Sequence, residues 1–220
     1  MHRSLKTLDQ TEPGWAHVAL LTIDMQNDFA LAEGSGFVPG TDEILPALAD
    51  LIHAFRKSQL PIFHAVRLYL EDGSNAERCR QRVLQSGLSL ARPGTSGARA
   101  VDVIRSSNAP DESSALLAGE YVPLSSSEWL FYKSRWSAFH GTGLEEHLLG
   151  LDVDTVVVAG CNFPNCPSAT LFDATERNFR AVLVSNAVSG LSESGIRWCT
   201  GIGVATLTVA QVRSQIQVRK

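Results

Sequence analysis

Short apolar runs of strand length, separated by segments of helix length, are the feature that most constrains the fold of this 220-residue chain. Four of the runs are almost continuously apolar, as in strands that are buried on both faces of a sheet. These runs lie at 16–23 (AHVALLTI), 61–66 (PIFHAV), 155–159 (TVVVA) and 181–184 (AVLV). We therefore expect an α/β fold with three layers (α-β-α), built on a doubly wound, mainly parallel, Rossmann-like sheet of about six strands.

The remaining elements follow from periodicity and from residues that favour helix ends. Two further strands are predicted, at Glu128–Tyr132 and at 203–209, and a polar tail follows the second of them. Helices are predicted at 41–57, 75–85, 141–150, 167–178 and 192–200. Thr41 suits the start of the first of these helices, and Pro167 is a favoured first helical residue of the fourth.

Residues 86–127 differ from the rest of the chain because turn-forming residues dominate them, as in ARPGTSGA, SSNAPDESS and PLSSS. Such a long irregular segment in a compact domain is typical of a lid, a binding loop or an oligomer contact. We expect one short helical piece near 97–105. Residues 1–15 read as a polar N-terminal extension. Since 220 residues suit one domain and 86–127 is too short to be a second one, the whole chain, 1–220, is predicted to be a single domain.

Bulk charge and hydropathy limit the partners of the chain. The formal net charge is −4, which does not suggest binding to nucleic acid or to an anionic membrane. No apolar run approaches the roughly 20 residues that span a bilayer, and the N-terminus lacks the apolar core of a signal peptide. We therefore expect a cytoplasmic protein that acts on a small molecule, without a nucleic-acid or membrane partner.

The chain has four cysteines, namely Cys79, Cys161, Cys166 and Cys199. A single C-x₄-C pair without a second pair does not match a zinc site, and disulfides are not expected in a reducing compartment. Two interpretations remain for each cysteine, a small buried hydrophobic side chain or a reactive thiol.

Three predicted strands bring polar groups to the same edge of the sheet. Asp24 ends the first strand, Lys133 follows the strand Glu128–Tyr132, and Cys166 follows the strand 155–159 at the start of a helix. Active sites of parallel α/β sheets form beyond the carboxyl ends of the strands. Taken singly, Asp24 could cap a turn and Lys133 could be a surface lysine, but together a carboxylate, an ammonium and a thiol indicate a catalytic site.

These three groups suit nucleophilic acyl transfer through a thioester. A helix N-terminus and a nearby lysine are expected to lower the pKa of the Cys166 thiol. Asp24 can accept the thiol proton and later pass it to a leaving nitrogen. The loop 160–166 can offer backbone N–H groups to a developing oxyanion.

The sequence resembles the isochorismatase-like cysteine hydrolases, which include nicotinamidases, N-carbamoylsarcosine amidases, and ureidoacrylate and biuret hydrolases. The resemblance runs from LLTIDMQNDF through YKSRWSAFHGTGLEEHL to VVVAGCNFPNCPSATLFDATERNFRAVLVSNA. In that family an aspartate ends the first strand, a lysine follows the third, and a cysteine stands six residues after a glycine. Asp24, Lys133 and the pair Gly160/Cys166 fit this pattern.

The resemblance implies further features of the site. The family carries a non-proline cis peptide after that glycine, which corresponds here to Cys161–Asn162, and an oxyanion hole formed by the backbone N–H groups of Asn162 and Cys166. It also implies a homodimer or homotetramer. Nicotinamidases have an Asp-x-His metal site after the second strand, where this chain has Arg67, so we expect no metal and no other cofactor.

Four side chains are candidates for substrate binding, namely Phe29, Arg67, Trp136 and Phe163. Arg67 could bind a substrate carboxylate or could pair with the turn at Glu71 and Asp72; the alternative for the three aromatic residues is packing. The loop also departs from the family pattern, because Phe163 replaces a small residue and Pro164 removes a backbone donor.

Several other polar residues are interpreted as structural. His64 is expected in the core, Gln26 and Asn27 are expected to brace loops, and His140 is expected in an exposed loop. Cys161 is expected to be a buried thiol, and the arginine cluster at 78–82 a solvated helix face.

The sequence as a whole predicts a cysteine-dependent amidohydrolase that cleaves a C–N bond of a small amide, ureide or carbamoyl compound. Two alternatives stay open. One is a vinyl-ether hydrolase of the isochorismatase type, in which the aspartate protonates the substrate and no cysteine is needed. The other is a non-catalytic binding or regulatory member of the family.

Overall fold

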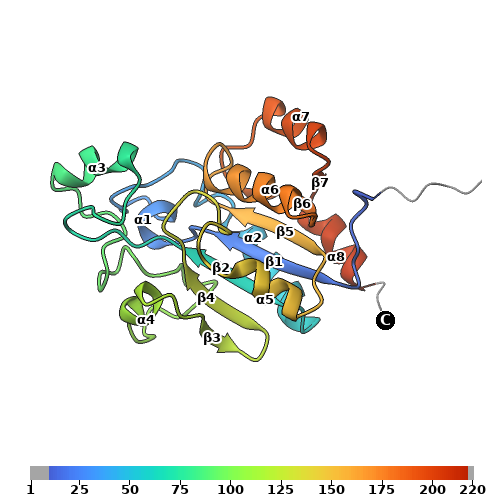
Figure 1. Cartoon of the computed structure of the whole chain (residues 1–220), viewed down its shortest axis with the longest axis horizontal. Helices are drawn as coiled ribbons and strands as arrows, with labels where there is room; N and C mark the ends of the chain where they lie inside the picture. The colour runs from blue at the N-terminus through green and yellow to red at the C-terminus, as the bar shows by residue number, and fades with distance from the viewer. Residues whose placement is uncertain (1–9, 218–220) are drawn as a thin grey trace, which may run out of the picture.

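The computed structural model describes residues 10–217, and these residues form one seven-stranded sheet with helices on both faces (Figure 1). The strands are β1 (Val18–Ile23), β2 (Ile62–Val66), β3 (Val122–Ser125), β4 (Glu128–Tyr132), β5 (Thr155–Gly160), β6 (Arg180–Val188) and β7 (Ala205–Leu207). The order across the sheet is β3-β4-β2-β1-β5-β6-β7, and only β3 runs antiparallel to its neighbour. The expected three-layer, doubly wound fold is therefore confirmed.

The helices within the described range are α1 (Asn27–Ala30), α2 (Leu45–Lys57), α3 (Arg78–Gln85), α4 (Ser113–Leu117), α5 (Leu144–Gly150), α6 (Cys166–Glu176), α7 (Glu193–Gly201) and α8 (Val209–Gln217). Side chains of β1 alternate between two apolar clusters, because successive residues of a strand point to opposite faces. Val18 and Leu20 pack on the side of α2 and α8, whereas Leu21 and Ile23 pack on the side of α5, α6 and α7. Figure 1 shows α5 and α6 in front of the sheet.

The direction in which the chain adds strands to the sheet reverses between β1 and β5, which run parallel to each other. From β1 the chain adds β2 and β4 on one side, and from β5 it adds β6 and β7 on the other. A crevice forms at such a switch point, beyond the carboxyl ends of the strands. The loops after β1 and β2, together with α1 and α3, gather beyond that end of the sheet (Figure 1, left).

The structure corrects the expected number of strands. Strand β3 lies inside the segment 86–127, which we expected to be irregular apart from one helical piece. This strand is a half-exposed edge that includes Pro123, so it carries no buried apolar run that could reveal it in the sequence. The short helix expected near 97–105 is absent from the described fold, since backbone groups there pair with the loop after β1 instead, as Asn27 N does with Arg99 O and Val101 N with Met25 O.

The start of one predicted helix and the expected polar tail also differ from expectation. Helix α2 begins at Leu45 rather than 41, because the buried Thr41 hydroxyl donates to Ser189 Oγ at 2.8 Å instead of capping a helix. The expected polar tail is helix α8, whose buried Val209, Val212 and Ile216 pack near α2 at helical spacing. Residues 1–9 of the expected N-terminal extension lie outside the described residues.

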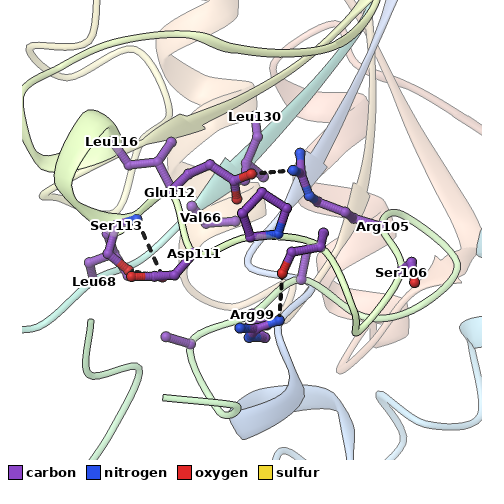
Figure 2. A pocket seen from close by; sticks show the side chains of 14 residues that line it. Val66, Leu68, Arg99, Arg105, Ser106, Asp111, Glu112, Ser113, Leu116 and Leu130 are labelled. Atoms are coloured by element: carbon purple, nitrogen blue, oxygen red, sulfur yellow. Dashed lines mark hydrogen bonds and ion pairs between the residues drawn. The ribbon is translucent and has the colours of Figure 1, made fainter. Parts of the chain in front are cut away.

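Charged side chains link different parts of the segment 86–127 to one another, as Figure 2 shows. Arg105 pairs with Glu112, and Arg99 Nη1 donates to the carbonyl oxygen of Ala109 at 2.8 Å. These residues enclose a cavity of about 30 Å³, which is the size of one or two water molecules. The apolar part of its wall is formed by Val66, Leu68, Leu116 and Leu130. This part of the segment therefore lies against β2 and β4.

In the described range, no helix is both long enough and apolar enough to cross a membrane.

Candidate active site

Asp24 leaves strand β1 in a conformation that is rare for residues other than glycine. Its φ is 51°, in the left-handed region, and its N–H still bonds to Ala65 O of the neighbouring strand at 2.9 Å. Such strained residues persist where the surrounding structure holds them and are common at functional sites. The turn places the Asp24 side chain, which is 6% exposed, in the crevice between β1 and β5.

Lys133 lies behind Asp24 rather than in the crevice. Its N–H bonds to Val66 O and so extends the pairing of β2 with β4 by one residue. Its side chain is fully buried, and Nζ donates to Asp24 Oδ2 at 2.9 Å and to Arg135 O at 3.2 Å. Lys133 therefore neutralises and orients the carboxylate, while Asp24 Oδ1 has no hydrogen-bond partner among the described residues.

The loop from β5 to α6 begins at a glycine that no other residue can replace without strain. Gly160 has φ 119°, and a Cβ there would lie 2.3 Å from Ile23 O. The expected cis peptide at Cys161–Asn162 is not found, because residues 10–217 contain no cis peptide bond. The chain turns with trans bonds instead, through Gly160 and through Asn165, whose φ and ψ are −119° and −103°.

Cys166 is the first residue of α6, as expected for a nucleophile at a helix N-terminus. The N–H groups of Asn162 and Cys166 donate no hydrogen bond within residues 10–217, so both are free for an oxyanion. The Asn165 side chain braces the loop by donating to Asn162 Oδ1 at 3.0 Å.

The expected low pKa of Cys166 is wrong. Burial, followed by the negative charge of Asp24, raises the pKa of this thiol to about 11, and the opposing effects of Lys133 and Arg67 are smaller. Only 6% of Cys166 is exposed, and its thiolate would lose most of its hydration. The sequence could not show this burial. The thiol is therefore protonated at neutral pH and needs a base.

A cavity of about 100 Å³ brings most of the predicted site residues together. Those that line it are Asp24, Phe29, Arg67, Trp136, Asn162 and Cys166. Two predicted site residues do not line it: Lys133 lies behind Asp24, and Phe163 is buried against Gly195 and Trp198, with its ring centroid 5.9 Å from that of the tryptophan. Phe163 thus packs beneath α7 and is not part of the cavity wall.

Arg67 follows β2 and is 2% exposed. Its Nη2 lies 2.6 Å from Glu77 Oε1 and 3.9 Å from Cys166 Sγ, whereas its Nη1 has no partner in the described structure. The expected alternative partners, Glu71 and Asp72, are not those that it contacts. Burial opposes its charge, but the carboxylates of Asp24 and Glu77 help to raise the pKa of Arg67 above the ordinary arginine value, so it stays a cation.

The residues interpreted as structural lie where expected. His64 is fully buried between Thr22 Oγ1 at 2.7 Å and Glu128 Oε1 at 2.8 Å. Gln26 braces two loops through Arg67 O and Ala98 O, both at 2.7 Å. The remaining assignments also hold: Asn27 donates to Ser96 O, His140 is exposed, and Cys161 is buried.

The sequence matches the Isochorismatase domain family over residues 18–215, which is most of the chain. The chain belongs to the isochorismatase family.

Three relatives place the chain within the isochorismatase family. A probable inactive nicotinamidase from Arabidopsis thaliana is 29% identical over 201 residues, which cover 89% of this chain and 94% of that protein. An N-carbamoylsarcosine amidase from Arthrobacter is 24% identical over 180 residues, covering 82% of this chain and 62% of the relative. The crystal structure of an isochorismatase family protein from Desulfovibrio vulgaris superposes with a TM-score of 0.76 at 31% identity, over 91% of this chain and 98% of that one.

Sequence reasoning missed part of the site of this isochorismatase-family chain. Tyr69, Arg80 and Asn165 also line the cavity, and Glu77 holds Arg67. Tyr69 and Arg80 come from the loop after β2 and from α3, whose path over the sheet end is set by tertiary contacts. In the arginine cluster at 78–82, Arg78 and Arg82 are exposed, as expected of a solvated helix face, whereas Arg80 is half-buried and lines the cavity. Within the described range, no group of three potential ligand residues is placed to hold a metal ion.

Proposed function

We propose that this protein is a cysteine-dependent amidohydrolase that cleaves a C–N bond of a small amide, ureide or carbamoyl compound through a thioester. One observation carries the proposal: Asp24 and Cys166 share a small cavity, and a fully buried Lys133 holds the Asp24 carboxylate at 2.9 Å. That arrangement provides a nucleophile, a base and a fixed counter-charge in one site.

The first half of the reaction forms the thioester. Asp24 accepts the Sγ proton of Cys166 while sulfur attacks the carbonyl carbon, and the electron pair of the C=O bond moves to oxygen. The free N–H groups of Asn162 and Cys166 stabilise that oxyanion. The C–N bond then breaks, and Asp24 gives its proton to the leaving nitrogen.

The second half regenerates the enzyme. Water attacks the thioester carbon and gives a proton to Asp24, the C–S bond breaks, and the thiolate recovers its proton as the acid leaves. A raised thiol pKa suits this sequence, because the cysteine rests as a neutral thiol and is ionised only as it attacks. Lys133 acts through Asp24, whose charge it balances in both halves.

The nucleophile is tested by replacing Cys166. We expect wild-type protein to release ammonia from at least one member of a panel of small primary amides and ureides, and Cys166→Ala to reduce that rate by at least a thousandfold. Cys79→Ala is the matched control, since Cys79 is exposed on α3. Full activity in Cys166→Ala would reject the mechanism, whereas activity that is independent of the cysteine on a vinyl-ether substrate would favour the isochorismatase type.

A non-catalytic role is the second candidate, and the name of the Arabidopsis relative, a probable inactive nicotinamidase, favours it. Against it stands the complete Asp24–Lys133–Cys166 set. A mechanism-based test separates the two, because incubation with an activated amide or ester should leave an acyl group on Cys166 that mass spectrometry can locate. The absence of this adduct, together with no turnover on the panel, would support the binding role.

A further inference from the structure

Arg67 is one of the buried groups in the described structure whose hydrogen-bonding capacity is incomplete. Its side chain is 3% exposed, and Nη2 is engaged by Glu77 at 2.6 Å. Nη1 is buried without a hydrogen-bond partner among the described residues, although the guanidinium lines the cavity that holds Cys166. An unpaired buried donor costs free energy, and an arginine offers a planar pair of N–H groups that match a carboxylate.

The position of Arg67 is fixed from behind. Glu77 immediately precedes α3, its Oε1 holds Arg67 Nη2, and its Oε2 accepts a hydrogen bond from the Tyr69 hydroxyl at 3.4 Å. The guanidinium also lies over the Tyr69 ring, 5.4 Å from its centroid. A side chain that is held on one edge and unpaired on the other is preorganised to receive an anion.

The charge of the cavity wall also favours the binding of an anion. Two of its three charged residues balance their charge inside the fold, Asp24 with Lys133 and Arg67 with Glu77. The third is Arg80, which forms no ion pair with a described residue and lies over the Trp136 ring at 5.4 Å. The wall therefore carries a net positive charge, which attracts anions and disfavours cations.

We propose that the substrate of this site is an amide that bears a carboxylate, which Arg67 binds close to the scissile carbonyl. The proposal rests on the amide hydrolysis proposed above and names its substrate class. Nη2 lies only 3.9 Å from Cys166 Sγ, and the cavity measures about 100 Å³. Because the guanidinium is this close to the sulfur and the cavity is this small, a carboxylate bound by Arg67 and a carbonyl attacked by Cys166 belong to one short molecule. Short monoamides of dicarboxylic acids have this form.

The test compares monoamides with diamides of the same acids. Succinamate and succinamide have the same shape and the same scissile amide, but only the first carries a carboxylate; malonamate and malonamide extend the comparison to a shorter chain. We expect wild-type protein to prefer the monoamides in kcat/KM by roughly tenfold to a hundredfold, the range of a hydrogen bond to a charged group.

The variants assign that preference to Arg67. Arg67→Met alone would leave the buried Glu77 carboxylate without its cation and destabilise the fold. Arg67→Met/Glu77→Gln removes both charges, so no unpaired buried charge remains. The double variant is expected to hydrolyse both amides at similar rates. Arg197→Gln is the control, because Arg197 is exposed on α7 and its one ion pair among residues 10–217 is with Glu193 at 3.8 Å. Preference retained in the double variant would overturn the proposal.

Calorimetric binding to Cys166→Ala separates this proposal from the catalytic one. If Cys166→Ala binds succinamate more tightly than succinamide, and adding Arg67→Met/Glu77→Gln removes the difference, the carboxylate site is supported. That conclusion holds even if wild-type protein hydrolyses neither compound. The absence of hydrolysis would instead reject the proposed amide hydrolysis. Cysteine-dependent hydrolysis of neutral amides, with no preference for monoamides, would overturn the carboxylate site and leave the proposed mechanism standing.

Discussion

Lys133→Met is the perturbation whose outcome the structure constrains most closely. The Lys133 side chain is fully buried and Asp24 is 6% exposed, and Nζ donates to Oδ2 at 2.9 Å. Methionine fills nearly the same space as lysine without its charge. The variant therefore leaves the Asp24 carboxylate in the same place without the ammonium group that donates to it.

The expected cost follows from that burial. Breaking a buried ion pair by removing one partner destabilises proteins by roughly 3–5 kcal/mol, whereas replacing both partners by neutral groups is often close to neutral. We expect Lys133→Met to lose about 3–5 kcal/mol of the free energy of unfolding at pH 7, and Asp24→Asn/Lys133→Met to recover most of it. For a chain of this size, the single variant should lower Tm by roughly 6–20 °C.

Urea unfolding followed by circular dichroism measures this directly. The midpoint should fall in Lys133→Met with the m-value unchanged, and the double variant should return toward wild type while staying inactive. Arg197→Met is the control, since it removes an exposed positive charge on α7. A Lys133→Met variant as stable as wild type would refute the claim that Lys133 balances a buried carboxylate.

Three further predictions concern groups outside the reacting pair. Burial raises the pKa of Cys199 to about 11, so the folded state keeps a proton that the unfolded chain loses near pH 9. The free energy of unfolding should therefore fall between pH 9 and pH 11. Cys199→Ala should flatten that slope by about 1.4 kcal/mol per pH unit, as measured in urea titrations. Burial alone would raise the pKa of Glu128, but hydrogen bonds from His64 and Arg56 hold it at about 2. Glu128→Gln should lose roughly 3 kcal/mol at pH 7, less as pH falls from 4.5 toward 2, and a pH-independent loss would contradict this. Gly160→Ala adds a methyl 2.3 Å from a backbone oxygen of β1 at φ 119°, so it should cost roughly 2–4 kcal/mol and abolish activity, as thermal unfolding and the amide assay will show.

The central strands could be predicted because their apolar runs are unambiguous. Val156 to Ala159 are all fully buried, as the run TVVVA indicates, and β5 follows it to within one residue. The edge strand β3 and helix α8 escaped prediction, since each carries only part of an apolar pattern. Their formation depends on a neighbour, β4 for the strand and α2 for the helix.

The same contrast holds in the site. Asp24 directly follows β1, and Cys166 begins the helix that follows β5; both were predictable because parallel strands end at one edge of the sheet. Phe163 was assigned to the cavity because it stands in the nucleophile loop, yet its ring turns to Trp198. The direction of the Cys166 pKa shift was also mispredicted, because a helix N-terminus is visible in the sequence and the degree of burial is not.

The site is formed by residues that follow several different strands, and this has a consequence for folding. The ion pair of Lys133 with Asp24 joins residues 109 positions apart, and the contact of Arg67 with Cys166 joins residues 99 positions apart. Contacts of such long sequence separation form late and slow folding, because loop closure precedes any gain from them. Recovery of activity during refolding should therefore lag behind recovery of helical signal, which makes catalysis a reporter of the last step in assembling the sheet.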